Sequence, residues 1–338
     1  MEQVPLLTPA QILNATAEFF GQPVLKMTAP GGKSRTSFRA YLPGRTVIVS
    51  QRRQSAKSAV ETHVLTQLGG ATDRLPRLLG SAGGLMFQSD VGHRRLNWVI
   101  HTLAPDQRPV LAAQAVDALF DIHRAASRVG LATTLPRPAV PHRPDDKIFA
   151  AADRLAVQLH HSGPGLDRAA LSPWFWAQPC RFVKWDCRAG NAALDEANHL
   201  RWFDFEDARL GQGPEDFAWL MADETWPVDI AVMLDLVGAR LTDADTPSPH
   251  DFMTYLAEFT TLMAVRRIRL IFSEAKQKGW LDRTSILKYD LVGTNPHMGE
   301  RLSVMAAALS RRTPSTAPLE PLFERAAEVF RKVRTPAT

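Results

Sequence analysis

Cysteine, long apolar runs and an excess of one charge are scarce or absent in this sequence. Its 338 residues contain only two cysteines, Cys180 and Cys187, which excludes a disulfide framework and a four-cysteine metal site. So few thiols are typical of a reducing compartment, and we expect a cytoplasmic protein. No stretch approaches the roughly 20 apolar residues that cross a bilayer, and residues 1–20 lack the pattern of a signal peptide. We therefore expect no membrane partner.

Neither sign of charge dominates. Lys and Arg number 40 against 35 Asp and Glu, which leaves a net charge of +5 with the two signs interleaved. A nucleic-acid surface needs clustered basic residues, so we expect no nucleic-acid partner. The arginines at 52–53 and 266–269 leave two interpretations open: contacts to an anionic ligand, or solvated ends of helices and strands. Nothing in the sequence indicates an oligomeric state.

The length favours two packed lobes, because a domain usually holds about 100 to 200 residues. Up to about residue 90, short β-like runs surround a single helix. We expect strands at 23–29, 37–42, 45–51 and 84–90, and a helix at 55–70. We expect hairpin turns at Pro30-Gly31-Gly32 and at Pro43-Gly44. This half of the sequence predicts a small antiparallel sheet that carries one helix.

Long helical periodicities follow Gly92. Apolar residues recur at spacings of three and four through 107–126 and 250–279. Between them, 181–207 alternates like a β-hairpin. We therefore predict an α+β, bilobal fold, with residues 1–90 as the smaller sheet lobe and residues 91–338 as a larger, mainly helical lobe.

Three oxygen-bearing side chains converge in the predicted hairpin. Asp186 precedes Asn191 by five residues, and two β-like runs separated by a polar turn would fold Asp204 back beside Asn191. Such hard oxygen ligands suit Mg²⁺. Phosphoryl transfer needs a carboxylate to accept the proton of an attacking hydroxyl, a role for Asp186, and metal ligands, a role for Asn191 and Asp204. Taken alone, Asp186 and Asn191 would be more typical of turn caps than of a metal site.

The longer pattern decides between these interpretations. The motif D-x-x-x-x-N from Asp186 is followed by a strand that ends in Phe203-Asp204-Phe205-Glu206, and then by G-x-x-x-x-D-x-A from Gly211 to Ala218. This combination resembles the aminoglycoside phosphotransferase and choline kinase family. The resemblance implies a protein kinase-like fold, ATP and Mg²⁺ as cofactors, and transfer to the hydroxyl of an aminoglycoside-, choline- or sugar-like molecule. It also implies that Asp216 organises the loop of the base.

Two positions near the base need comment. The family usually has His and Gly immediately before the base, whereas this sequence has Lys184 and Trp185. Arg188 lies where kinase-like enzymes often place a group that contacts the transferring phosphoryl group, and a guanidinium suits that task. A surface arginine is the alternative interpretation.

The third strand lacks the lysine that grips phosphates in kinases. Arg52 or Arg53 can substitute, and Glu61 in the following helix is the candidate partner. Alternation along the strand puts Ile48 and Ser50 on the same face as Arg52, which favours Arg52. Gly31 and Gly32 lie where a phosphate-covering loop belongs, although a Gly-Gly turn taken alone is more often a plain hairpin. By order of elements, 85–89, with Gln88, is expected to connect the lobes and to offer backbone groups to an adenine ring.

Other residues are less specific. We expect His123 to be a packed helix residue. The tryptophans around the site indicate either an aromatic-lined substrate pocket or core, and core is favoured for Trp202 and Trp219. Asp223, Glu224 and Asp229 are candidates for a local acidic pocket.

Two functions fit these patterns. One is an ATP- and Mg²⁺-dependent small-molecule kinase. The other is a catalytically impaired, kinase-like nucleotide-binding or regulatory module, which the missing lysine and the Lys184-Trp185 pair favour. The complete set of Asp186, Asn191 and Asp204 favours the enzyme, because a scaffold does not need a metal site.

Overall fold

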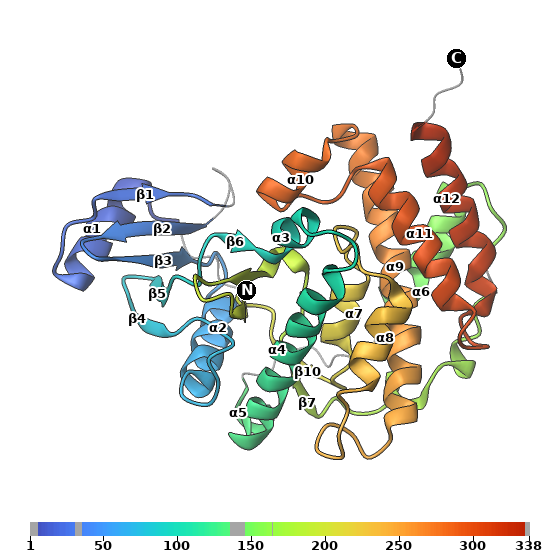
Figure 1. Ribbon diagram of the computed structural model, residues 1–338, viewed down its shortest axis with the longest axis horizontal. Coiled ribbons are helices and arrows are strands. Elements are labelled where there is room, and N and C mark those ends of the chain that lie inside the picture. Colours follow the sequence, from blue (N-terminus) through green and yellow to red (C-terminus); the bar gives the residue numbers. More distant parts are fainter. Residues whose placement is uncertain (1–5, 31–35, 136–145, 164, 335–338) are drawn as a thin grey trace.

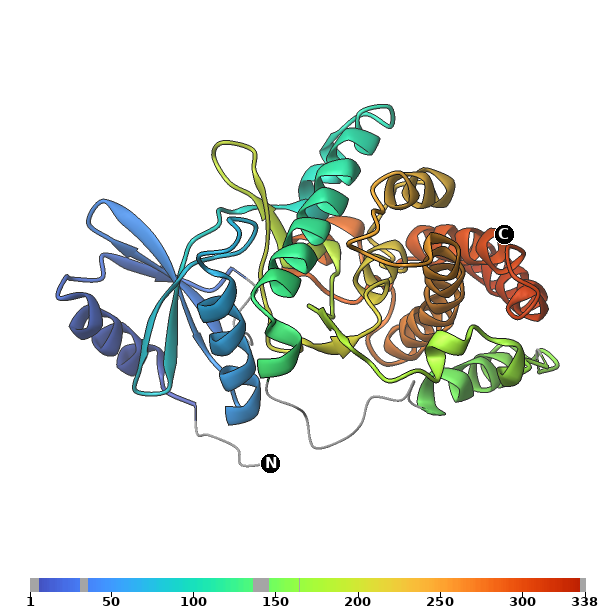
Figure 2. The ribbon, with the colours of Figure 1, turned by 90° about the horizontal axis from the view of Figure 1, so that it is seen from below.

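An antiparallel sheet with two helices occupies one end of the molecule, and a larger helical body occupies the rest (Figures 1 and 2). The computed structural model describes residues 6–30, 36–135, 146–163 and 165–334. The α+β architecture predicted from the sequence is confirmed, with the sheet at the N-terminal end of the chain. In the described part of the chain, no helix combines the length and the apolar composition needed to cross a membrane.

The main sheet has five strands in the order β1-β2-β3-β5-β4. The elements of this end of the molecule are α1 (Pro9–Phe20), β1 (Lys26–Thr28), β2 (Ser37–Leu42), β3 (Arg45–Gln51), α2 (Ser55–Leu68), β4 (Leu78–Ala82) and β5 (Leu85–Ser89). The expected hairpin at Pro43-Gly44 joins β2 to β3, and Gly44 has the positive φ of 77° that such a turn favours. Gly31 and Gly32 lie outside the described residues.

The central strand β3 divides the sheet into two faces, as its alternation predicts. Val47 and Val49 are buried with residues of α1 and β5 in one hydrophobic cluster. Ile48 and Ser50 line a cavity on the opposite face, and Arg52 lines it just beyond the strand. Period two thus sends apolar side chains into the core and leaves the other face for a ligand.

The helix α1 was not expected from the sequence, although its signals are present there. Thr8 and Gln11 form a capping box, with the Thr8 hydroxyl accepting from Gln11 N and the Gln11 amide oxygen accepting from Thr8 N. The helix packs on the sheet through Phe19, whose ring stacks on Phe87 with centroids 4.2 Å apart. This packing closes the face of the sheet that does not line the cavity.

The expectation that 85–89 connects the lobes is wrong. These residues form β5, which pairs with β3 on one side and β4 on the other, and Gln88 is opposite Ile48 in the register. The run was long and apolar enough to be a buried strand, and the neighbouring β4, which was not predicted, covers its second edge. The chain leaves the sheet only after Ser89.

Helices dominate the rest of the chain. The elements are β6 (Arg94–Arg95), α3 (Leu96–Thr102), α4 (Arg108–Arg128), α5 (Leu131–Thr134), α6 (Asp146–Gln158), β7 (Arg181–Val183), β8 (Ala192–Leu194), β9 (Leu200–Trp202), β10 (Arg209–Gly211), α7 (Glu215–Met221), α8 (Ile230–Gly238), α9 (Pro249–Lys278), α10 (Arg283–Tyr289), α11 (Pro296–Ser310) and α12 (Glu320–Arg334). The predicted helices at 107–126 and 250–279 are confirmed as α4 and α9. Two small sheets, β6-β8-β9 and β7-β10, lie in the part of the helical body that is nearest the main sheet (Figure 1).

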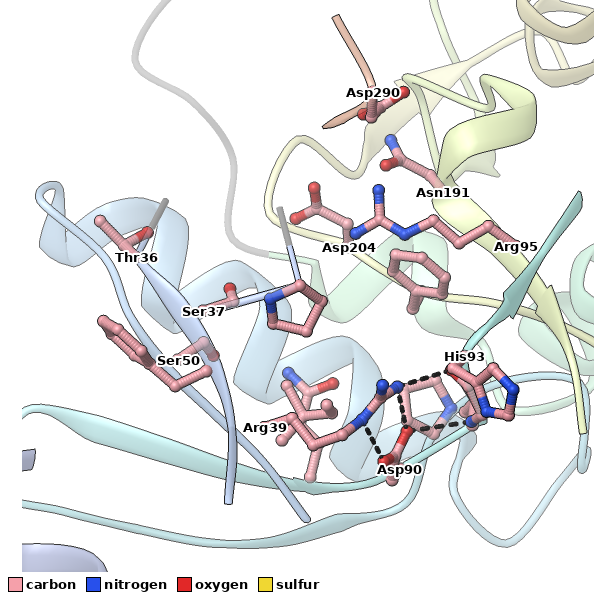
Figure 3. A pocket seen from close by; sticks show the side chains of 18 of the residues that line it. Thr36, Ser37, Arg39, Ser50, Asp90, His93, Arg95, Asn191, Asp204 and Asp290 are labelled. Atoms are coloured by element: carbon pink, nitrogen blue, oxygen red, sulfur yellow. Dashed lines mark hydrogen bonds and ion pairs between the residues drawn. The ribbon is translucent and has the colours of Figure 1, made fainter. Parts of the chain in front are cut away.

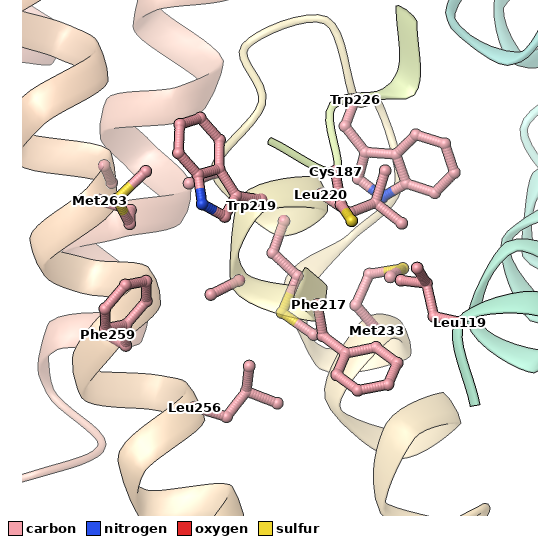
Figure 4. Close-up of a cluster of buried hydrophobic side chains, with 14 of the residues drawn as sticks. Leu119, Cys187, Phe217, Trp219, Leu220, Trp226, Met233, Leu256, Phe259 and Met263 are labelled. Atoms are coloured by element: carbon pink, nitrogen blue, oxygen red, sulfur yellow. The ribbon is translucent and has the colours of Figure 1, made fainter. Parts of the chain in front are cut away.

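One large hydrophobic core holds this body together, and it includes the loop that follows β7. Figure 4 shows Leu119 of α4, Phe217 of α7, Met233 of α8 and Met263 of α9 in this core together with Cys187. All five are buried, and Cys187 has no exposed surface. Because Cys187 is anchored among helices, the residues beside it in the loop have fixed positions.

Candidate active site

The loop after β7 has an unusual backbone. Trp185 and Asp186 both have positive φ, 60° and 46°, and Asp204 has φ of 67°. L-residues rarely adopt this conformation, which costs about 1 kcal/mol or more for each residue and persists only where the surroundings enforce it. Three such residues in one region indicate a functional site.

Asp216 enforces the conformation of the loop. Its carboxylate is fully buried and accepts hydrogen bonds from two consecutive backbone amides, Lys184 N and Trp185 N, each at 2.7 Å. His123 Nε2 lies 2.8 Å from the same carboxylate. Asp216 therefore organises the loop as expected, and His123 is a packed helix residue that supports it.

Lys184 takes a structural place in the site. Its side chain is completely buried, with Nζ donating to the carbonyl oxygen of Asp204 at 3.0 Å. The ammonium also lies 5.2 Å from the centroid of the Phe205 ring and 5.9 Å from that of Trp202, where cation–π attraction partly replaces lost hydration. The lysine thus joins the loop of Asp186 to the segment of Asp204.

Asn191 lies directly beside Asp186. Its Nδ2 donates to the backbone oxygen of Asp186 and to its Oδ2, both at 2.9 Å. The predicted hairpin is confirmed: β8 pairs with β9, and Phe203 N donates to Asn191 O at 2.9 Å. The strand return therefore brings Asp204 alongside Asn191, and Figure 3 shows the two side chains close together at the edge of a cavity.

The pair fits a magnesium ion. With both hydrogens of the Asn191 amide directed at Asp186, its Oδ1 is available, and Asp204 adds a carboxylate. One or two protein oxygens with phosphates and water completing the shell are what Mg²⁺ uses. Within the described residues no cluster of three or more His, Cys, Asp or Glu could hold a metal.

The electrostatic surroundings keep Asp204 ionised. Burial opposes its charge, but Arg52, Lys184 and Arg188 outweigh burial and hold the pKa of Asp204 below its usual value. A carboxylate that stays charged is the form that binds a cation.

Arg52 reaches this carboxylate from the sheet. Its Nη2 lies 2.8 Å from Asp204 Oδ1 and 2.5 Å from Glu61 Oε2, and its Nη1 lies 2.9 Å from Glu206 Oε2. Glu61 is 1% exposed, and Gln88 Nε2 lies 3.4 Å from its other oxygen. The expected ion pair with Glu61 is thus made by Arg52, whereas Arg53 is exposed at the edge of the cavity.

These residues line one cavity of about 1140 Å³ between the sheet and the helical body. The sheet contributes Ser37, Ile48 and Ser50, and the opposite side contributes Asn191 and Asp204 (Figure 3). A volume of this order accommodates a nucleotide-sized ligand. Asp186 is not among the described residues that line this cavity, but Asn191, which donates to its carboxylate, is.

Comparison with known proteins gives one kind of match. No protein-family model and no curated protein matches the sequence. Among solved structures, the streptomycin–ATP ternary complex of APH(2″)-IIa superposes with a TM-score of 0.52 at 14% identity over 80% of this chain and 96% of that chain. Macrolide 2′-phosphotransferase MphH from Brachybacterium faecium gives 0.51 at 15% identity over 83% and 97%. A candidate aminoglycoside phosphotransferase from Ralstonia eutropha gives 0.53 at 15% identity over 96% and 98%. The chain has the aminoglycoside phosphotransferase fold.

The sequence did not indicate two residues that line the large cavity, Arg95 and Asp290. Arg95 lines the large cavity, and Figure 3 shows its guanidinium directed toward Asp204 and Asn191. Asp290, at the end of α10, lines the cavity from the far side. Arg95 follows the connection between the sheet and the helical body. From the sequence, we expected that connection too early in the chain, at 85–89. Asp290 carries no sequence signal, because it reaches the site only through packing of distant helices.

Arg188 pairs with the carboxylate of Asp186 in this structure. Its Nε and Nη2 lie 2.8 and 3.2 Å from Asp186 Oδ1 and Oδ2, and its Nη1 lies 3.5 Å from Asp290. Burial opposes its charge, but Asp290 and Asp186 raise the pKa of Arg188 well above its usual value. A Cβ at Gly190 would collide with the Asp290 carboxylate, which explains the glycine there. Contact of Arg188 with a phosphoryl group stays a prediction.

The expected acidic pocket is wrong. Asp223 is buried and accepts from Ala189 N at 2.8 Å. Glu224 is buried in an ion pair with Arg267, with Nε to Oε2 at 2.8 Å, and Asp229 caps α8. Burial makes Asp223 and Glu224 structural, whereas Asp229 is exposed and its carboxylate is engaged in the helix cap, where it accepts from Ala231 N. Trp202 and Trp219 are buried in the core as expected.

Proposed function

We propose that this protein is an ATP- and Mg²⁺-dependent phosphotransferase that phosphorylates a hydroxyl of a small molecule. The observation that carries the proposal is the convergence of Asp186, Asn191 and Asp204 beside a nucleotide-sized cavity, with Arg52 facing them from the sheet. The solved neighbour that contains streptomycin and ATP supports it through its fold. On this proposal residues 1–90 are the ATP lobe and residues 91–338 the catalytic and substrate lobe.

The residues divide the work of phosphoryl transfer. Asn191 Oδ1 and the Asp204 carboxylate would hold the Mg²⁺, whose chemistry is to neutralise charge on the phosphates. Arg52 replaces the usual lysine as the phosphate contact and is oriented by Glu61. Arg53 at the edge of the cavity, Gly31 and Gly32 are further candidates for contacts to ATP. Gln88 orients Glu61 in addition to lining the cavity.

Asp186 accepts the proton of the acceptor. The hydroxyl oxygen forms a bond to the terminal phosphorus of ATP, the bond from that phosphorus to its bridging oxygen breaks, and ADP leaves. The proton of the hydroxyl passes to Asp186, which Asn191 and Arg188 hold in a fixed orientation by three hydrogen bonds to its carboxylate. Positioning of this kind contributes most of the catalysis in phosphoryl transfer.

One observation favours the alternative of a catalytically impaired nucleotide-binding module. Arg52 occupies Asp204 Oδ1 in this structure, so the arginine that contacts phosphate also competes for a metal ligand. A catalytic enzyme requires the guanidinium to exchange this carboxylate for the phosphates of ATP.

Turnover separates the two functions. We expect Mg²⁺ and ATP to yield ADP and a phosphorylated alcohol with the wild type, and Asp186→Asn to lower the rate by about 1000-fold while ATP affinity changes little. Mass spectrometry of the alcohol and an ADP assay give the readouts. Unchanged turnover in Asp186→Asn would remove Asp186 as the base, and ATP binding without turnover across a broad panel of alcohols would favour the impaired module. The two unpaired cysteines support a reducing location such as the cytoplasm.

A further inference from the structure

A second cavity lies on the other side of Asp186. Its volume is about 600 Å³, and its walls include Trp185 and Asp186 of the catalytic loop together with residues of β10, α7 and α9. Asn191 and Asp204 line the large cavity, whereas Asp186 lines this one. The base thus lies between a cavity that fits ATP and a cavity that fits something else. A hydroxyl in the second cavity would meet Asp186 directly.

Aromatic rings form much of the wall of this second cavity. Those lining it are Trp174, Phe175, Trp185, Trp219, Tyr255 and Phe259. Trp185 meets Trp219 edge to face, with centroids 5.9 Å apart, and Tyr255 lies 5.6 Å from Phe259. Flat apolar walls of this kind favour a ligand that contains a ring or an apolar skeleton.

Arginine supplies the positive charge of the cavity. Arg154 of α6, Arg209 of β10, and Arg266 and Arg269 of α9 all line it. The guanidinium of Arg209 stacks over the Trp185 ring at 4.3 Å. Arginine is the side chain suited to carboxylate, sulfate and phosphate groups, because its planar fork donates two parallel hydrogen bonds.

Each acidic residue of the lining already has a partner. Asp186 is paired with Arg188, and Asp207 lies 3.0 Å from Lys57 Nζ, both cations outside the lining of this cavity, while Asp207 also lies 3.8 Å from Nη2 of the lining residue Arg209. Glu215 is buried and accepts from Gly213 N at 2.7 Å, and burial raises the pKa of its carboxyl group. The described lining thus holds four arginines against two acids that are paired with cations and a third, Glu215, that is buried.

Two buried donors in the wall have no acceptor among the described residues: Arg269 Nε and Trp219 Nε1. Burying a donor without an acceptor is costly, and native structures rarely leave such groups unsatisfied. Burial, together with the charge of Arg266, also lowers the pKa of Arg209, although Asp207 opposes this. A ligand that carries negative charge and only accepts hydrogen bonds would satisfy both donors and would stabilise the charged form of Arg209.

We propose that this second cavity binds the acceptor, and that the acceptor is a ring-bearing or apolar alcohol with a carboxylate, sulfate or phosphate group. The inference rests on the proposed phosphotransferase function and narrows its substrate. The anionic group pairs with Arg266 and Arg269, the apolar skeleton lies against the aromatic wall, and the hydroxyl reaches Asp186. A polycationic aminoglycoside would bring its charges against the arginines, and this cavity would disfavour it.

Three alcohols that share one skeleton test the charge preference. They are para-(hydroxymethyl)benzoate, its neutral amide, and the corresponding para-(aminomethyl)benzyl alcohol, which is cationic. Because three tryptophans line the cavity, quenching of intrinsic fluorescence reports binding without any nucleotide. We expect the carboxylate to bind at least about tenfold more tightly than the amide, and the amine to bind most weakly.

Variants assign this preference to the cavity. In Arg266→Gln/Arg269→Gln the carboxylate and the amide should bind within about twofold of each other, whereas Lys276→Gln, an exposed substitution on the same helix, should keep the preference. The single variant Arg266→Gln removes an exposed side chain and gives the test if the double variant fails to fold. Equal binding of the three alcohols to the wild type, or a preference that survives the double substitution, would overturn the inference.

A parallel measurement separates this inference from the function beneath it. Mg²⁺-dependent ATP binding is measured on the same preparations. If ATP binds and the anion preference is absent, the substrate inference alone fails. If ATP does not bind, the phosphotransferase proposal fails, regardless of how the three alcohols bind.

Discussion

Arg52, which follows the central strand of the sheet, and Asp204, which follows β9 in the helical body, form an ion pair with 2.8 Å between Nη2 and Oδ1. The same nitrogen lies 2.5 Å from Glu61 Oε2. Burial opposes the charge of Arg52, but Glu61, Asp204 and Glu206 raise the pKa of its guanidinium. One arginine thus connects the two sides of the large cavity through three carboxylates.

The first prediction concerns the cost of breaking this connection. Arg52→Gln leaves Glu61 buried without its cation, and we expect the free energy of unfolding to fall by about 3 kcal/mol. Adding Glu61→Gln should restore much of this loss, because it removes the unpaired charge. Urea unfolding of the single and double variants measures both effects, with Arg53→Gln as the exposed control. Additive losses in the double variant would show that the pair is not coupled.

The second prediction concerns Lys184. Its ammonium donates to Asp204 O and lowers the pKa of the Asp204 carboxyl group. Lys184→Met removes both effects, and we expect the affinity for ATP with Mg²⁺ to fall about tenfold. Lys184→His, which retains a ring donor, should recover part of the loss. Calorimetric titration with ATP and Mg²⁺ gives the affinities; wild-type affinity in Lys184→Met would refute this role.

The third prediction concerns Asp216, whose two oxygens accept from three donors. Asp216→Asn places an amide donor against a backbone N–H, so the loop should shift and displace Asp186. We expect kcat to fall about 100-fold. ATP affinity should stay within about threefold, because Asn191 and Asp204 remain. If kcat is unchanged while stability falls, Asp216 has only a structural role.

The fourth prediction concerns pH and His101. Its Nε2 bonds to Thr225 O and its Nδ1 to the Arg283 guanidinium. Burial, then the charge of Arg283, lower its pKa from 6.5 to about 4. The unfolded chain therefore binds a proton before the folded protein does, and stability falls as the pH decreases from 6.5 to about 4.

His101→Gln removes this contribution. After allowance for the partial exposure of the ring, we expect the variant to lose about 1 to 2 kcal/mol less stability than the wild type between neutral pH and the low end of that window. Urea unfolding at the two pH values gives the difference. Parallel pH profiles for the two proteins would exclude His101 as a cause.

Local signals predicted the centre of the site. The polar turn between two short β-runs brought Asp204 to Asn191, since a hairpin fixes its own register. Alternation along β3 selected Arg52 over Arg53. Local signals do not predict long-range packing. Asp290 reaches the site from the end of a helix distant in the sequence, and the contact of Lys184 with Asp204 depends on two loops that meet in the core. The strand at 84–90 was predicted, but its assignment as the connection between the lobes was wrong, because an apolar run does not reveal whether other strands cover both of its edges.

The central claim is that Asp204 binds the metal of a nucleotide site. Calorimetric titration of ATP with and without Mg²⁺, on the wild type and on Asp204→Asn, tests it most directly. The account predicts binding that strengthens at least about tenfold with Mg²⁺ in the wild type, and loses this dependence in Asp204→Asn. ATP affinity that ignores Mg²⁺ in the wild type, or a magnesium dependence that survives in Asp204→Asn, would contradict it.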